Sequence, residues 1–129
     1  MATQTSHARN ATCDDEQWAV RVDLAAAFRL AVHFDWHESV ANHFSASIGN
    51  DGKNVLLNPR WKHFFLIKAS DLLLVDSDDP TTMDRPDAPD PSAWSIHSAI
   101  HRNVHHARVA LHLHPPYATM VLLWWFGDG

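Results

Sequence analysis

Two histidines set one residue apart are the residues of this sequence best suited to chemistry. His112 and His114 stand in the stretch LHLHPP, residues 111–116, after an apolar run and directly before two prolines. Alternate residues of a β-strand project from the same face, so both imidazoles can reach one zinc ion at a Zn–N distance of roughly 2.0–2.1 Å. The alternative, two polar side chains at a strand end, stays open because the chain holds 11 histidines.

A second group of histidines follows helical spacing. His97, His101 and His105 recur at every fourth residue of the segment 94–106, and such a pair on one helix face can also bind zinc. The segment has no glutamate of the HExxH kind and therefore no base, so a solvated or packed helix face is the alternative. A catalytic zinc ion takes three protein ligands and an open position, and neither group identifies the third ligand. The histidines without ligand spacing are predicted to be structural: His33, His37, His43 and His63.

Composition limits the classes of protein that this chain can belong to. With 129 residues, 46% of them hydrophobic and 19% charged, the sequence predicts one globular domain with a modest core. A net charge of −5 gives no basic field for nucleic acid or anionic lipid. The single cysteine, Cys13, excludes an internal disulfide and fits a reducing cytosol. The apolar stretch 117–126 is shorter than the roughly 20 residues of a membrane span, so we expect a cytoplasmic protein.

The elements that must position the histidines follow from periodicity and turn residues. After a flexible tail over residues 1–13, the pattern predicts a helix to about residue 34 and, after the loop 76–93, a second helix over 94–106. Strands are predicted over 44–48, 54–57, 72–75 and 108–113, and a last helix over 117–125. This order indicates a mixed α/β or α+β sheet domain. The closing WWFGDG leaves three aromatic residues with little chain to cover them, which predicts either packing on another subunit or a domain that stops before it is complete.

Taken together, three segments resemble the class II aldolase/adducin N-terminal domain. They are RVDLAAAFRLAVHFDWHESVANHFSAS at 21–47, LLNPRWKHFFLIKASDLLLVD at 56–76 and SIHSAIHRNVHHARVALHLHPPYATM at 95–120, with the HxHP element as the most specific signature. The resemblance covers about 100 residues in the family's order, and is strongest to the branch akin to adducin heads. It implies an α/β fold, a three-layer αβα domain with a mostly antiparallel central sheet, of which residues 14–129 form the N-terminal part, incomplete at the C-terminus.

The resemblance also implies a chemistry and partners. Enzymes of the family form homo-oligomers, usually tetramers, and use zinc to polarise a small sugar phosphate during retro-aldol cleavage. By resemblance, His112 and His114 are zinc ligands, while Asn42, Ser45 and Ser92 fall in segments that hold substrate phosphate. Adducins imply, by analogy only, an association with the actin cytoskeleton.

Three departures from the family pattern bear on catalysis. Ala93 stands where the enzymes carry their acid/base glutamate, and alanine transfers no proton. The family's third zinc histidine is expected past position 129. Trp61 follows Asn-Pro-Arg where a glycine is usual, in a turn expected to approach the site. The sequence therefore predicts no catalytic residue, and a zinc-dependent lyase, an adducin-like interaction module and a truncated product without function stay open as alternatives.

Overall fold

The structure, a computed structural model, describes residues 15–104 and 106–127, and of residues 122–127 only the backbone. The tail expected over residues 1–13 and the histidine at position 105 lie outside the described residues. The helices are α1 (Asp15–His33), α2 (Pro91–Asn103) and α3 (Pro116–Gly127). The strands are β1 (His43–Ile48), β2 (Asn54–Leu57), β3 (Leu73–Asp76) and β4 (Val109–His112), and three short 3-10 turns are η1 (Phe64–Leu66), η2 (Ala69–Asp71) and η3 (Pro80–Asp84).

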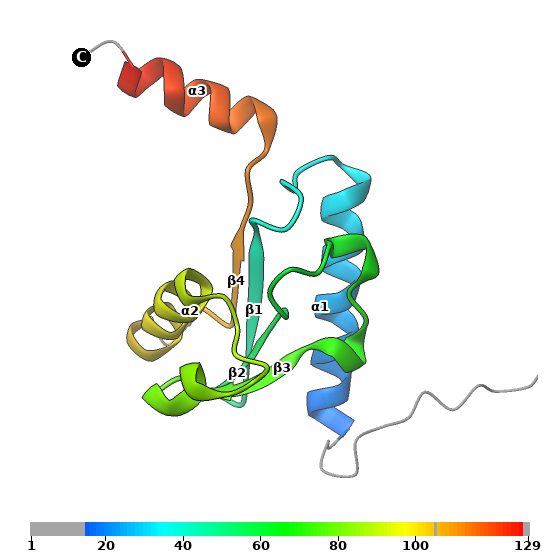
Figure 1. The fold of residues 1–129 in the computed structure, drawn as a ribbon, viewed down its shortest axis with the longest axis vertical. Helices are drawn as coiled ribbons and strands as arrows, with labels where there is room; N and C mark the ends of the chain where they lie inside the picture. The colour runs from blue at the N-terminus through cyan, green and yellow to red at the C-terminus, as the bar shows by residue number, and fades with distance from the viewer. Residues whose placement is uncertain (1–14, 105, 128–129) are drawn as a thin grey trace, which may run out of the picture.

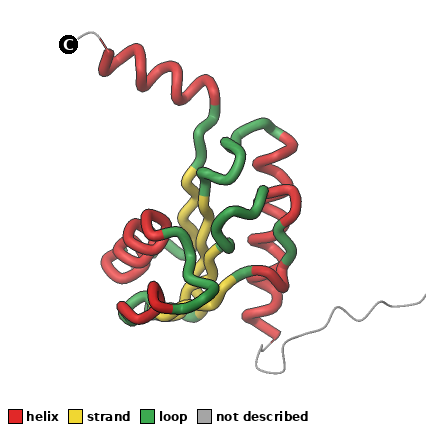
Figure 2. Tube along the Cα trace, viewed as in Figure 1, coloured by secondary structure: helices red, strands yellow, loops and turns green. Residues whose placement is uncertain are grey.

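The strands form one antiparallel sheet between two helices. Its order is β3-β2-β1-β4, and each neighbouring pair is antiparallel. Figure 1 shows α1 against one side of the sheet and α2 against the other, and Figure 2 shows the strands as the middle layer. The predicted αβα arrangement with an antiparallel sheet is confirmed.

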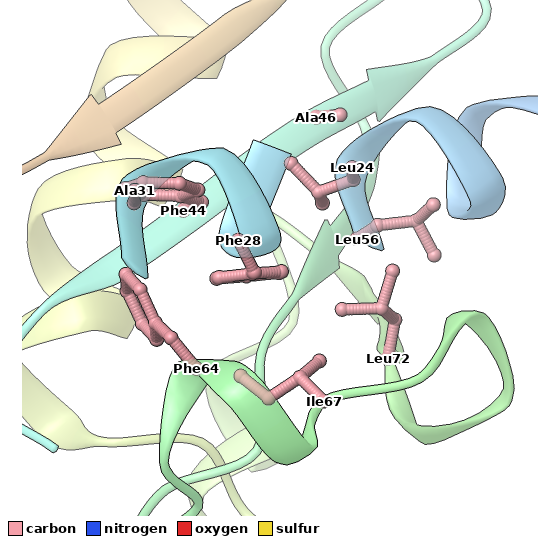
Figure 3. Packing of buried hydrophobic residues seen from close by; sticks show 9 residues of the cluster. All are labelled: Leu24, Phe28, Ala31, Phe44, Ala46, Leu56, Phe64, Ile67 and Leu72. Carbon is pink, nitrogen blue, oxygen red and sulfur yellow. The ribbon is translucent and has the colours of Figure 1, made fainter. Parts of the chain in front are cut away.

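The side of the sheet that faces α1 is apolar. Phe28 of α1 stacks on Phe44 of β1 with ring centroids 4.7 Å apart, and Phe64 packs edge-on against Phe28 at 4.6 Å. The nine buried residues of this cluster interlock between helix, sheet and η1 (Figure 3). They are Leu24, Phe28, Ala31, Phe44, Ala46, Leu56, Phe64, Ile67 and Leu72. Burial of this apolar area is the main stabilising term for the α1 layer.

The side that faces α2 changes character across the sheet. Over β2 and β3 it is apolar, where Val55, Leu57 and Val75 form a second buried cluster with Ala93 of α2. Over β1 the alternation that directs Phe44 towards α1 turns His43 and Ser45 towards α2 instead. His43 and Ser45 therefore face His97 and His101 of α2 on one half of this side of the sheet.

Both ends of α2 are fixed by particular residues. The Asp90 carboxylate accepts hydrogen bonds from the backbone N–H groups of Ser92 and Ala93, and Pro91 occupies the first turn. This cap starts the helix at residue 91, three residues before the predicted start. At the other end the hairpin turn meets the helix: Gly52 has φ +67°, and a Cβ there would lie 2.1 Å from the carbonyl oxygen of His101. Only glycine permits this approach.

The last helix leaves the body of the domain. Figures 1 and 2 show α3 projecting away from the sheet beyond β4. Tyr117, Met120 and Val121 are exposed by 84%, 64% and 61%. Within the described part of the chain, no helix combines the length and apolar character that crossing a membrane requires.

Candidate metal centre

The antiparallel pairing of β1 with β4 brings two histidines together. His43 and His112 are direct partners in the register, so their side chains lie on the same side of the sheet. His43 Nε2 lies 3.3 Å from His112 Nδ1, and the ring centroids are 4.5 Å apart.

His112 and His114 turn the same ring atom towards each other. Their Nε2 atoms are 3.0 Å apart, and the Nδ1 atom of His114 contacts the carboxylate of Glu38. Two imidazole nitrogens on one tetrahedral zinc ion stand about 3.3 Å apart, given the usual Zn–N bond length. Metal-bound histidines commonly hold their other ring nitrogen on a carboxylate or similar group, and here Glu38 and His43 occupy those places. The pair therefore fits a metal ion as two of its ligands.

A third ligand is not supplied by the residues that the structure describes. Among them no group of three or more His, Cys, Asp or Glu side chains is arranged to hold a metal ion. Glu38 and His43 face the Nδ1 atoms of the pair rather than the Nε2 atoms. The site, as described, provides two ligands with their supporting groups.

Behind this pair runs a line of buried polar side chains. His43 Nδ1 lies 2.9 Å from His97 Nε2, and His97 Nδ1 lies 2.5 Å from Ser45 Oγ. Ser45 Oγ in turn lies 2.7 Å from His101 Nε2, and His101 Nδ1 donates to the carbonyl oxygen of Ala107 over 3.0 Å. We call the residues of this line, together with the pair, the histidine chain: His101, Ser45, His97, His43, His112 and His114.

The histidine chain differs from the two groups that spacing suggests. His97 and His101 are each 1% exposed and face the sheet, so the solvated helix face is wrong and the packed interpretation of His97 is right. His43, for which spacing predicts only a structural place, links α2 to the metal pair. A sequence signal existed, because His43 and Ser45 at strand spacing can face His97 and His101 at helix spacing.

Burial keeps most of these imidazoles neutral. Desolvation first, and then the neighbouring His43, His101 and His112, lower the pKa of His97 to about 4. Burial also lowers the pKa of His43 and of His101. The pKa of His112 falls through burial first and His114 second. At neutral pH these four rings hold one proton each.

The three residues predicted to hold substrate phosphate occupy different environments. Asn42 is 1% exposed, and its Oδ1 accepts the backbone N–H of Glu38. Ser45 is fully buried within the histidine chain. The Ser92 hydroxyl donates to Asp90 over 2.5 Å and lies 3.5 Å from His43 Nε2. Phosphate binding by these residues stays a prediction, and Ser92 is the only exposed one of the three.

The structure shows the surroundings of two residues that depart from the family pattern. Ala93 is 1% exposed and packs in the apolar cluster with Val55 and Leu57, so position 93 offers no group for proton transfer. Trp61 has φ +63° and is 74% exposed. It therefore holds the left-handed conformation that glycine adopts without strain.

A second histidine pair shows the same separation for a different reason. His37 Nε2 and His63 Nε2 are 3.0 Å apart. However, His63 Nδ1 accepts the backbone N–H of Phe65 over 3.1 Å. Neutral His63 therefore carries its proton on Nε2 and donates it to His37. This pair is a hydrogen bond and has no two free lone pairs for a metal ion.

Comparison with known families assigns the domain. The sequence profile described as "Class II Aldolase and Adducin N-terminal domain" matches residues 22–125. The chain belongs to this family, which confirms the resemblance identified from the sequence.

Curated relatives agree with this assignment. A Pseudomonas aeruginosa protein named for aldolase class 2 is 37% identical over 98 residues, which are 76% of this chain and 38% of that protein. A Caulobacter vibrioides protein named likewise is 35% identical over 83% of this chain and 42% of its own length. An adducin-related protein of Schizosaccharomyces pombe is 36% identical over 83% of this chain and 35% of its own length. The chain thus spans about two fifths of the length of these relatives.

Solved structures agree on the fold. An aldolase II superfamily protein from Pseudomonas syringae matches with a TM-score of 0.74 and 35% identity, over 85% of this chain and 44% of that chain. L-fuculose 1-phosphate aldolase from Glaciozyma antarctica matches with a TM-score of 0.71 and 23% identity, over 88% of this chain and 47% of that chain.

Proposed function

We propose that this chain contributes two histidine ligands, His112 and His114, to a zinc site of the class II aldolase type. The observation that carries the proposal is the convergence of their Nε2 atoms at 3.0 Å, with both Nδ1 atoms engaged elsewhere. A carboxylate only accepts, so Glu38 fixes the proton of neutral His114 on Nδ1 and leaves its Nε2 lone pair free. When bound, zinc supplies Lewis-acid polarisation of a substrate carbonyl.

The substrate class we propose is a small sugar phosphate, in a cytoplasmic homo-oligomer. The support for this class is family membership together with the pair of proposed zinc ligands at the end of β4. Ser92 is exposed and its hydroxyl lies 3.5 Å from Nε2 of His43, which supports it as a side chain that could bind a phosphate oxygen. Its hydroxyl would first have to leave the carboxylate of Asp90.

The described residues do not complete a retro-aldol mechanism. Proton transfer to and from the substrate needs a base within hydrogen-bonding reach, and position 93 holds a buried alanine. Glu38 is occupied by His114, and Asp90 by the cap of α2. We therefore propose that this chain alone binds zinc and does not cleave sugar phosphates.

Zinc content after equilibrium dialysis tests the proposal. We expect wild-type protein to retain about one zinc ion per chain, and His112→Ala to lose it. His63→Ala is the matched control, because it removes one histidine of a pair with the same 3.0 Å separation but no free lone pairs. Loss of zinc in both variants, or in neither, would contradict the assignment to His112 and His114.

An activity assay tests the second half of the proposal. Incubation of the zinc-loaded chain with L-fuculose 1-phosphate or ribulose phosphates should release no aldehyde product. Zinc-dependent cleavage would show that a base exists which the described residues do not reveal, and would overturn this part.

A non-catalytic interaction module is the second candidate function. It is favoured by the adducin-related relative, which is 36% identical over 83% of this chain, and by the alanine at position 93. Co-sedimentation with actin filaments tests it. Saturable pelleting with filaments would support the adducin-like role, and its absence at high filament concentration would end it.

A further inference from the structure

The histidine chain connects two groups that can only accept hydrogen bonds. At one end stands the carbonyl oxygen of Ala107, and at the other the carboxylate of Glu38. Between them six groups form seven links, and each neutral imidazole or hydroxyl brings one proton. Six protons cannot fill seven links, so one link holds two facing lone pairs.

The direction of the buried links follows from the Ala107 end. His101 must donate from Nδ1 to the carbonyl oxygen, so its Nε2 accepts the hydroxyl proton of Ser45. Ser45 Oγ then accepts from Nδ1 of His97. A neutral imidazole has one donor and one acceptor nitrogen. A ring that donates from Nδ1 must therefore accept at Nε2, which fixes the direction of the next hydrogen bond.

The same polarity reaches the metal pair. His97 Nε2 accepts from Nδ1 of His43, and His43 Nε2 accepts from Nδ1 of His112. From the other end, Glu38 takes the Nδ1 proton of His114. The two series meet at the Nε2 atoms of His112 and His114, where the unfilled link lies.

Burial explains why the unfilled link lies there. Ser45, His97 and His101 are exposed by no more than 1%, and unpaired polar atoms in such surroundings carry the full desolvation cost. His112 and His114 are half-buried, so a cation or water can reach them. The low pKa of His97 also excludes an additional proton deep in the chain.

We propose that Ser45, His97 and His43 are positioning residues that hold His112 in the Nδ1–H tautomer and thereby keep its Nε2 free for a metal ion. This inference rests on the proposed zinc function of His112 and His114. Without the Ser45 hydroxyl, the donor-to-acceptor direction of the hydrogen bonds from His97 through His43 to His112 can reverse. His112 would then donate from Nε2 to His114, and a hydrogen bond would occupy the place of the ion.

Nitrogen NMR of the metal-free protein tests the inference without any metal. The ring-nitrogen shifts distinguish the Nδ1–H from the Nε2–H tautomer of each labelled histidine. In wild-type protein we expect Nδ1–H for all four rings that the polarity fixes, namely His101, His97, His43 and His112. Nε2–H at His112 in the wild type would overturn the inference, whether or not zinc binds.

The variant Ser45→Ala tests the mechanism. We expect His112 to shift towards Nε2–H and zinc affinity to fall about tenfold or more, although both ligands remain. The matched control is Ser47→Ala on the same strand, because Ser47 Oγ bonds Arg108 and lies outside the histidine chain. Ser47→Ala should keep the wild-type tautomers and affinity.

The two proposals fail in distinguishable ways. Unchanged tautomer and unchanged affinity in folded Ser45→Ala would overturn the positioning role while leaving the zinc site intact. Absence of zinc binding in wild-type protein with His112 in the Nδ1–H form would overturn the proposed function instead. If Ser45→Ala does not fold, the wild-type tautomers still decide the inference.

Discussion

His43 on β1 and His97 on α2, 54 residues apart in the sequence, share a hydrogen bond of 2.9 Å in the interior. The bond joins Nδ1 of His43 to Nε2 of His97. The other ring nitrogen of His97 contacts Ser45, and the other ring nitrogen of His43 contacts His112. The contact joins the helix layer to the strand whose partner, β4, carries His112 and leads to His114. The half of the sheet that presents His43 and Ser45 to α2 is thus both a packing interface and the support of the candidate site.

Acid should destabilise the protein through His97. Its pKa is about 4 in the fold and near 6.5 in the unfolded chain, so the unfolded state binds more protons between these values. The stabilising contribution is complete above pH 6.5 and is lost as the pH falls towards 4. At pH 5 we expect a loss of about 2 kcal/mol from this residue alone, measurable by urea unfolding at pH 7.5 and pH 5.

The variant His97→Gln separates this effect from general acid sensitivity. It should flatten the pH dependence of the unfolding free energy. Ser98→Ala is the control on the same buried face of α2, because Ser98 is 2% exposed, does not titrate and finds no hydrogen-bond partner for its hydroxyl among the described residues. Equal pH dependence in wild type and His97→Gln would contradict the assignment.

Gly52→Ala should disturb the packing of α2 against the turn between β1 and β2. A Cβ at this position would lie 2.1 Å from the carbonyl oxygen of His101, in a backbone at φ +67°. We expect a loss of about 3 kcal/mol from strain and displacement together. Gly49→Ala, at φ +71° but with its nearest contact at 4.0 Å, should lose only about 1 kcal/mol. Equal losses in denaturant unfolding would show that the close approach to α2 does not matter.

Trp61→Gly should stabilise the fold. The indole is 74% exposed, so little buried area is lost, and glycine removes the strain of φ +63°. The left-handed strain outweighs the greater chain entropy of glycine by about 0.5–1 kcal/mol. Trp61→Ala keeps the Cβ and should gain nothing. Thermal unfolding of both variants checks the difference, and an equal gain in Trp61→Ala would assign the effect to the indole instead.

Ala93→Glu should not create an aldolase. The new carboxylate would enter the apolar cluster of Val55, Leu57 and Val75 without a described partner, at a cost of about 3 kcal/mol. Ser95→Glu, on the exposed face of the same helix, should cost little. Urea unfolding and an aldol-cleavage assay check both parts. Cleavage by Ala93→Glu at wild-type stability would mean that position 93 reaches the substrate.

Periodicity and turn residues were sufficient to predict the helices and strands of this domain, whereas the three-layer arrangement followed from the family resemblance. The alternation of Phe44 and Ala46 with serines predicted β1, and GNDGK predicted its turn to β2. The start of α2 was predicted three residues late, because Asp90 and Pro91 sit in a proline-rich segment that reads as loop. Local signals therefore located the helices and strands, but they placed the start of α2 late and read η3 (Pro80–Asp84) as part of a loop.

The spacing of the residues that support the site is visible in the sequence, but their contacts with one another could not be predicted from it. Spacing identified His112 and His114, since alternate residues of an extended segment share a face, although β4 itself ends at His112. The link from His43 to His97 depends on which strand lies beside β4 and how far α2 slides along the sheet, and neither is a local property. The same limit hid Glu38, which reaches His114 from a loop 76 residues away.

The proposed zinc site is tested most directly by NMR of the cadmium-substituted protein with isotope-labelled histidine nitrogens. A metal-bound nitrogen couples to cadmium, so the spectrum names the atoms that bind. We predict one ion per chain, coupled to Nε2 of His112 and Nε2 of His114 and to no other ring nitrogen of the histidine chain. Coupling to an Nδ1 atom, coupling to His97 or His101, or no coupling at saturating cadmium would contradict it.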